Sequence, residues 1–307
     1  MAARDIRTGV RNRIGIDDES LFGLITVLPT IIVILGALVV PGAYALAASL
    51  HEIHAFDPEW TMVGINNYRT ILNEAEFYNA LTNGIVFTIG SIAVQLCLGI
   101  VVALLVNDLK NRLVTAVTIA LYIIPTAVVS VVFNRMLTQR VGVYHNLLTD
   151  LGLIGVDVSI WADSTLAMLG VIFVGSYKFA MFVTIMVLAR LQSIPTYYYE
   201  AATMSGATKL DKFVDITLPQ LRGVIALVVL LRAIWMFNNF DIIWILTQGG
   251  PSASTETLPI YAFKLTFSDL QYGLGTTVAM IMFFVLAIGG IAYLTLFNPE
   301  QDVEEGD

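Results

Sequence analysis

Residues 200–219 read EAATMSGATKLDKFVDITLP and lie within the longest polar interruption of an otherwise apolar chain. This interruption covers residues 192–222 and separates two long apolar stretches. Pro195 is suited to the first turn of a helix, so Tyr197–Ser205 is predicted to be a short helix. Gly206 suits the residue that ends it. The sequence therefore predicts a helix–turn–helix between two apolar helices, in a form that can dock another protein.

The amino-acid composition indicates what surrounds those apolar stretches in the folded protein. Of the 307 residues, 57% are hydrophobic and 13% are charged, whereas a soluble domain typically carries about 25% charged residues. A water-soluble core cannot bury so much apolar surface, so lipid must cover part of it. The net charge of −8 argues against nucleic acid as a partner, because phosphate binding needs clustered Lys and Arg. The single cysteine, Cys97, excludes an intrachain disulfide.

Six stretches reach the length of about 20 mainly apolar residues that a membrane-spanning helix needs. None shows the short alternating pattern of a membrane β-barrel. We therefore predict an all-α integral membrane protein with six transmembrane helices. The predicted spans are Leu21–Leu50, Ala80–Val106, Leu113–Leu137, Thr165–Ala189, Gly223–Leu246 and Thr276–Leu296.

Basic residues are distributed unevenly between the two sides of the predicted spans. Four arginines precede the first span, and Lys and Arg recur in the second and fourth loops, whereas the odd-numbered loops are poorer in them. By the positive-inside rule, both termini are predicted to be cytoplasmic in a multi-pass protein of the cell membrane. The chain then divides into a cytoplasmic segment 1–20, a six-helix domain 21–297 and an acidic cytoplasmic tail 298–307.

The polar loop 192–222 matches E-A-A-x3-G-x9-I-x-L-P, the EAA signature of permease subunits in ABC importers that use a binding protein. The chain resembles that family. The resemblance implies the permease fold of type I importers, with a cytoplasmic coupling helix between spans four and five that fits an ATPase subunit. Ser205 stands where the family often has aspartate. The residues that carry the match are Glu200, Ala201, Ala202, Gly206, Ile216, Leu218 and Pro219.

The residue types of this motif also suit a docking role on physical grounds. Small alanines let a helix sit closely in a groove of a partner. Glu200 offers a charge to a partner arginine or to an adjacent helix end. The competing interpretation is an ordinary amphipathic surface loop.

Span five and the loop after it narrow the resemblance. Residues 237–240 read FNNF and residues 246–251 read LTQGGP, as in sugar permeases of the maltose and glycerol-phosphate type. The resemblance implies a sugar or oligosaccharide substrate, with glycerol phosphate or another polyol-like solute as the alternative. It also implies that Asn238 and Asn239 lie where substrate binds, and amides suit sugar hydroxyls because they both donate and accept. Alternatively, these amides only join helices.

Span three resembles the same family over residues 124–130, which read IPTAVVS. In the family this stretch supplies a tyrosine and a serine to the sugar site. Ser130 is retained here, whereas Thr126 replaces the tyrosine and puts the same sugar in doubt. The alternative for Ser130 is a hydrogen bond to its own helix.

Two basic residues lie deep in predicted spans. Lys178 follows Tyr177 near the middle of span four, and both are candidates for the substrate site because an intramembrane lysine is functional by default. Lys178 either pairs with Asp241, faces the pathway, or extends along a tilted helix toward water. Arg232 in span five is better explained by a structural partner than by a ligand. For Asp241 we favour a structural or gating role over proton relay.

The sequence holds no G-x4-G-K-[ST] phosphate loop, so this chain is predicted to be neither an ATPase nor another enzyme and to bind no cofactor. The resemblance implies that ATP and magnesium are bound by a partner ATPase, in an importer that works by alternating access. The implied partners are a second homologous permease, two ABC ATPase subunits, an extracytoplasmic solute-binding protein, a sugar and membrane lipid, without nucleic acid. A proton-coupled secondary transporter and a membrane-embedded enzyme are the remaining alternatives.

Overall fold

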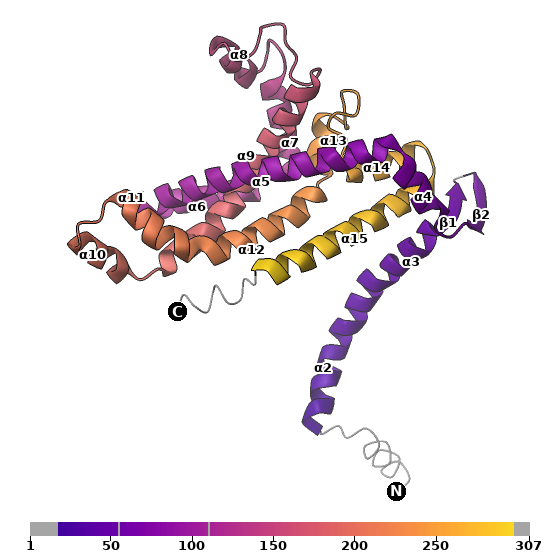
Figure 1. The fold of residues 1–307 in the computed structure, drawn as a ribbon, viewed down its shortest axis with the longest axis horizontal. Coiled ribbons are helices and arrows are strands. Elements are labelled where there is room, and N and C mark those ends of the chain that lie inside the picture. Colours follow the sequence, from indigo (N-terminus) through magenta and orange to yellow (C-terminus); the bar gives the residue numbers. More distant parts are fainter. Residues whose placement is uncertain (1–17, 55, 110, 298–307) are drawn as a thin grey trace.

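The computed structural model describes residues 18–54, 56–109 and 111–297, and these residues are mostly helical (Figure 1). The predicted tail 298–307 and most of the predicted segment 1–20 lie outside the described residues. The elements are α2 (Asp18–Ile34), the π-helical η1 (Leu35–Val39), α3 (Val40–Ser49), β1 (His51–His54), β2 (Asp57–Met62), α4 (Asn66–Asn73), α5 (Ala75–Leu109), α6 (Arg112–Ile123), α7 (Thr126–Leu137), α8 (Val143–Asp150), α9 (Ser164–Ser193), α10 (Thr196–Met204), α11 (Lys209–Lys212), the π-helical η2 (Phe213–Thr217), α12 (Leu218–Phe237), α13 (Asp241–Leu246), α14 (Leu258–Phe263), the π-helical η3 (Lys264–Ser268) and α15 (Tyr272–Phe297).

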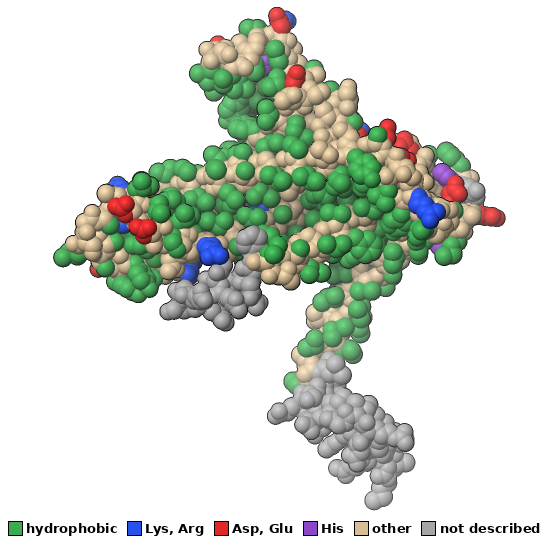
Figure 2. Space-filling view, viewed as in Figure 1, with side chains coloured by type: hydrophobic (Ala, Val, Ile, Leu, Met, Phe, Trp, Pro, Cys, Tyr) green, Lys and Arg blue, Asp and Glu red, His purple; other side chains and the backbone are tan. Residues whose placement is uncertain are grey.

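Five helices of the described residues are long and apolar enough to cross a membrane, and the bent pair α6–α7 makes a sixth crossing if it is counted as one span. This confirms the predicted all-α membrane fold. Figure 2 shows an apolar flank along the helices, with acidic side chains at the two ends of the body and on the arm that holds α8. The five helices are Thr26–Ser49, Ala75–Leu109, Ser164–Ser193, Lys209–Phe237 and Tyr272–Leu296.

The third predicted span consists of two helices with a sharp bend between them. Helix α6 ends at Ile123, α7 begins at Thr126, and the two are bent by 92°. Pro125 lacks an N–H and keeps the residue before it out of the helical region; Ile124 accordingly has an extended ψ of 128°. Figure 1 shows α7 leading away from the main bundle toward α8, and we call these two helices the side arm.

The fifth predicted span is also interrupted. Helix α12 ends at Phe237 and α13 begins at Asp241, so residues 238–240 form a break instead of the predicted helical interior. Asparagine side chains compete with helical backbone bonds, and both asparagines of the break bond to nearby backbone groups. Residues 51–54, which follow the first predicted span, form β1 and pair antiparallel with β2.

Helix α5 packs along α9 at the centre of the bundle. The contact is close because Gly99 lies opposite Val183, where an added Cβ would stand 2.5 Å from the valine Cβ. Small residues at such positions let membrane helices approach without unfilled space between them. The first long helix behaves differently: Figure 1 shows α2 diverging from the bundle, while α3 packs against α15.

Candidate functional site

The loop that carries the EAA pattern contains the predicted short helix, which is present as α10, Thr196–Met204. Its end is closed by two backbone bonds, from Gly206 N to Thr203 O at 3.0 Å and from Ala207 N to Ala202 O at 2.9 Å. This pair of bonds is a Schellman motif, and Gly206 has the positive φ of +81° that the motif requires. The turn is therefore built into the sequence at Gly206.

The second half of the loop is a rigid extension of span five. A capping box opens α11, with Thr208 N donating to Asp211 Oδ2 at 2.8 Å and Asp211 N donating to Thr208 Oγ1 at 3.3 Å. From there Lys209–Phe237 runs as one long helix, with Pro219 in the first turn of α12. The second half of the loop and α12 therefore form one continuous helix.

The loop is also tied to the bundle on its inner side. Tyr199 Oη lies 3.0 Å from Thr217 Oγ1, which joins α10 to the start of span five. Arg190, near the end of α9, donates to Gln220 O at 3.0 Å and to Gln220 Oε1 at 2.8 Å. The first contact ties α10 to span five, and the two bonds of Arg190 tie α9 to α12, at one end of the molecule (Figure 1).

The outer side of this loop presents uncovered groups. Glu200 and Ala201 are exposed and Ala202 is half-buried, so the motif offers a carboxylate beside a flat alanine surface. Leu218 and Pro219 are exposed as well. The same loop carries large apolar side chains that are exposed, namely Tyr197, Tyr198, Met204, Leu210 and Val214. The exposed part of the loop thus combines apolar side chains with charged groups, including Glu200, Lys209 and Asp211, and exposed apolar patches of this kind are typical of surfaces that bind other proteins.

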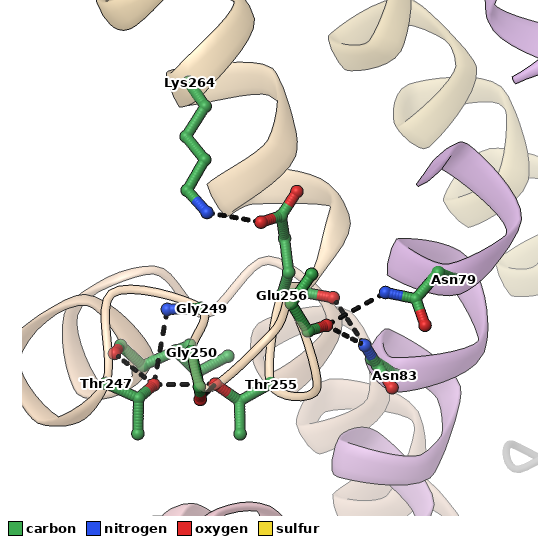
Figure 3. Close-up of polar contacts among 10 residues, drawn as sticks. Asn79, Asn83, Thr247, Gly249, Gly250, Thr255, Glu256 and Lys264 are labelled. Carbon is green, nitrogen blue, oxygen red and sulfur yellow. Dashed lines mark hydrogen bonds and ion pairs between the residues drawn. The ribbon is translucent and has the colours of Figure 1, made fainter. Parts of the chain in front are cut away.

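A second organised loop, the glycine-rich loop (residues 247–257), follows α13. Thr247 Oγ1 lies 2.7 Å from Thr255 Oγ1, and the latter hydroxyl donates to Gly250 O at 2.8 Å. Gly249 has a φ of +89°, and an added Cβ there would come within 3.2 Å of Lys264 Nζ. The loop is thus closed on itself, as Figure 3 shows.

Helix α5 holds the glycine-rich loop from the side (Figure 3). Asn79 and Asn83 both donate to Ala253 O at 2.9 Å, and Asn83 also donates to Glu256 O at 3.1 Å. The Glu256 side chain is buried and forms an ion pair with Lys264. The loop is therefore a fixed surface at the end of the molecule opposite α10.

Near that loop, Tyr261 donates a hydrogen bond to the Glu74 carboxylate. Burial and the adjacent carboxylate raise the pKa of the Tyr261 phenol, so it keeps the proton that it donates. This contact joins α14 to the residue that ends α4.

The two predicted substrate asparagines have different surroundings. Asn238 is exposed and donates to Ile234 O at 3.0 Å, and it contributes to a groove of about 440 Å³ between α12 and α15. Asn239 is half-buried, and its Oδ1 accepts from Ile242 N at 3.3 Å at the start of α13. Only Asn238 thus borders open space in a manner suited to a ligand.

The other predicted substrate residues lie around the side arm. Thr126 is the first residue of α7, and Ser130 is fully buried and donates to Thr126 O at 2.9 Å. Tyr177 on α9 is 38% exposed and packs on Phe133 of α7, with ring centres 4.9 Å apart. Asn134 Nδ2 lies 3.5 Å from Ile245 O, so the side arm also touches α13. Packing thus brings spans three, four and five together here.

Both intramembrane cations have structural partners. Lys178 is 6% exposed and donates to Tyr122 O and Ile124 O, so the alternative of a pair with Asp241 is not found. Arg232 is 1% exposed and donates to Gln95 Oε1 at 2.8 Å. Its guanidinium carbon lies 4.2 Å from the centre of the Phe179 ring, a cation–π geometry. Arg232 thus has the structural partner that we expected, although Gln95 is neutral.

Comparison with known proteins assigns the fold and the loops to a family. Residues 95–302 match the family described as binding-protein-dependent transport system inner membrane component. The chain belongs to this family. The trehalose/maltose transport system permease protein MalF of Thermococcus litoralis is 30% identical over 92% of this chain and 96% of its own length. The diacetylchitobiose uptake system permease protein DasB of Streptomyces coelicolor is 29% identical over 80% of this chain and 76% of its own length.

A solved structure shares the fold of this inner membrane component. It is a chain of a bacterial ABC transporter involved in the import of the acidic polysaccharide alginate, with a TM-score of 0.76 and 23% identity over 92% of this chain and 96% of that one. The curated relatives and this neighbour confirm the predicted resemblance to permeases of binding-protein-dependent importers, in an inner membrane.

The sequence analysis of this inner membrane component missed Gln95, Asn79 and Asn83. Asn79 and Asn83 are four residues apart at the start of an apolar helix, so they share one face. That spacing was a usable signal that one face of α5 binds a polar segment. Nothing in the local sequence connects Gln95 with Arg232, because 137 positions separate them.

Proposed function

We propose that this chain is the permease subunit of an ATP-driven importer that moves a sugar or oligosaccharide into the cell by alternating access. The observation that carries the proposal is the exposed helix α10, which ends at Gly206 and leads into the single helix Lys209–Phe237. Two similar permeases, named for trehalose/maltose and diacetylchitobiose, support a saccharide. The sulfoquinovosyl glycerol permease SmoG of Agrobacterium fabrum, 30% identical over 78% of both chains, supports a polyol-like alternative.

In this proposal the EAA loop receives the movement of the ATPase. Helix α10 sits in a groove of an ATPase subunit, with the small alanines at the contact and Glu200 as its charged group. ATP and magnesium stay on that partner. Closure of two ATPase subunits draws the loops together, and the continuous helix carries the displacement to the break after Phe237. The coupling residues are Glu200, Ala201, Ala202, Gly206, Leu218 and Pro219.

The remaining partners follow from the two ends of the molecule. The end with α10 faces the cytoplasm together with both termini, as the distribution of basic residues predicts. The glycine-rich loop then faces outward, and its fixed surface receives the solute-binding protein. A second homologous permease covers part of the apolar helix Thr26–Ser49, of which only 6% is buried within this chain, and completes the pathway.

Among the candidate substrate residues, we assign direct contact with the sugar to Asn238, with Thr126 and Tyr177 at the wall of the same pathway. Asn238 and Tyr177 are exposed and Thr126 is half-buried. Ser130 and Asn239 are less accessible than Asn238, because Ser130 is buried, Asn239 is half-buried, and each bonds to the backbone of its own segment. The amide of Asn238 suits hydroxyl groups because it offers both donors and an acceptor.

Replacing Asn238 with alanine is expected to raise the KM for the transported sugar about tenfold, which corresponds to about 1.4 kcal/mol, near the value of one hydrogen bond. Asn239→Ala is the matched control, because Asn239 caps α13. It should lower thermal stability while leaving KM near the wild-type value. Uptake kinetics with radiolabelled disaccharides in liposomes provide the measurement. Equal KM values for both variants would remove Asn238 from the sugar site.

The function as a whole is tested by purifying the tagged chain in mild detergent and identifying what accompanies it. Recovery of a second permease and an ATPase with a phosphate loop is expected, with ATP hydrolysis increased by a sugar-loaded binding protein. A chain that purifies alone and moves solute in liposomes without ATP would instead be a secondary transporter, and the proposal would be wrong.

A further inference from the structure

Helix α6 ends between two halves of a bent span, in a region where lipid provides no water for its last carbonyl groups. A helix leaves its final carbonyls without intrahelical partners, and an unpaired carbonyl is costly in a membrane. Pro125 supplies no N–H, and α7 turns away by 92°. The carbonyls of Tyr122 and Ile124 therefore need a donor from another element.

Lys178 of α9 is that donor. Its Nζ lies 2.5 Å from Tyr122 O and 2.6 Å from Ile124 O, and 5.0 Å from the centre of the Tyr122 ring. Within the described part of the chain, Lys178 forms no ion pair with a carboxylate. Its charge is balanced by the negative end of the α6 dipole and by the aromatic face. The ammonium group of Lys178 thus stabilises the break between α6 and α7 by donating to the carbonyls at the end of α6.

The residue before it contacts the other half of the same span. Tyr177 packs on Phe133 of α7, while Lys178 bonds the end of α6. Two consecutive residues of α9 therefore hold both sides of the bend. Because α7 begins at Thr126 and its Phe133 packs on Tyr177, the direction of α7 determines how α7 meets the ring of Tyr177 at the wall of the pathway.

We propose that Lys178 is a positioning residue that sets the angle between α6 and α7, and thereby places the wall of the sugar pathway without touching the sugar. That the pathway carries a sugar rests on the proposed function, whereas the role of Lys178 in setting the angle between the helices does not. A buried amine with two of its N–H groups engaged is poorly placed to bind substrate. This assigns to Lys178 a different task from that of Asn238.

The test uses spin labels on the two halves of the span, in the assembled complex in liposomes. Cysteines at Val117 of α6 and Val132 of α7, both exposed, are labelled in a Cys97→Ser background. Lys178→Met keeps the length of the side chain without its donors, and Lys178→Arg keeps charge and donors. Leu169→Ala, at an exposed position of α9, is the control.

Pulsed electron–electron double resonance should give one narrow distribution of the distance between the two spin labels in the doubly labelled parent protein. The Lys178→Arg and Leu169→Ala variants should give the same distribution. Lys178→Met should broaden or shift it and raise KM about tenfold, which corresponds to about 1.4 kcal/mol. An unchanged distance in Lys178→Met would overturn the proposal. An unchanged distance together with a raised KM would mean that Lys178 contacts the substrate directly. If the methionine variant does not assemble, Lys178→Leu, which also lacks donors and charge, replaces it under the same criteria. The distance needs no transport, so it stays informative if sugar import fails.

Discussion

Replacing Gly206 with valine is expected to reduce uptake to background and to abolish the stimulation of ATP hydrolysis by the binding protein. Gly206 has a φ of +81°, and a residue held in such a region costs about 1–3 kcal/mol, with β-branched residues at the upper end. The strain would open the two Schellman bonds that end α10. Helix α10 would then leave the orientation in which Glu200 meets the ATPase.

Controls separate this effect from a general loss of structure. Ser205→Ala alters the neighbouring residue, which is exposed and only bonds back to Ala201 O, so uptake should stay near the wild-type value. Gly206→Ala should be intermediate, because alanine tolerates a positive φ better than valine does. Capture of sugar by the binding protein should remain normal in each variant. Wild-type uptake in Gly206→Val would contradict the coupling role of this loop.

Replacing Arg232 with methionine is expected to give the largest loss of thermal stability. Arg232 is almost fully buried, and its guanidinium is the donor to Gln95 Oε1. Removing one partner of a hydrogen bond to a buried charge costs about 1.5–3 kcal/mol. Arg232→Lys should recover little, because an ammonium cannot stack its plane on Phe179 as a guanidinium does. The unfolding midpoint of the purified complex measures both variants.

A double variant tests whether the loss arises from the pair. Arg232→Met combined with Gln95→Leu removes the donor and the acceptor together, so no polar atom of this pair is left unsatisfied. Its midpoint should lie above that of Arg232→Met alone. If the loss of unfolding midpoint in the double variant equals the sum of the losses in Arg232→Met and in Gln95→Leu alone, the contact between these residues does not determine the stability of the bundle, and the interpretation is wrong.

Local patterns were sufficient for the spans because burial in lipid depends on the hydropathy of each segment by itself. They were insufficient to predict whether each span is one unbroken helix. Pro125 signalled that a helix could end there, yet a proline within an apolar stretch kinks some helices and ends others. The asparagines of span five were expected to contact substrate, and no local pattern indicated that Asn239 Oδ1 accepts a hydrogen bond from Ile242 N at the start of α13. The substrate and coupling roles of these residues stay predictions.

The sequence by itself determined that the chain is a helical membrane protein with a capped turn at Gly206, since hydropathy and positive φ are properties of short segments. Only the tertiary structure decided which side chains serve particular backbone carbonyls. Lys178 reaches carbonyls 54 and 56 positions away, and Asn79 reaches a carbonyl 174 positions away. An unpaired carbonyl is costly in lipid, and the packing of distant helices, which no local pattern encodes, determines which donor reaches it.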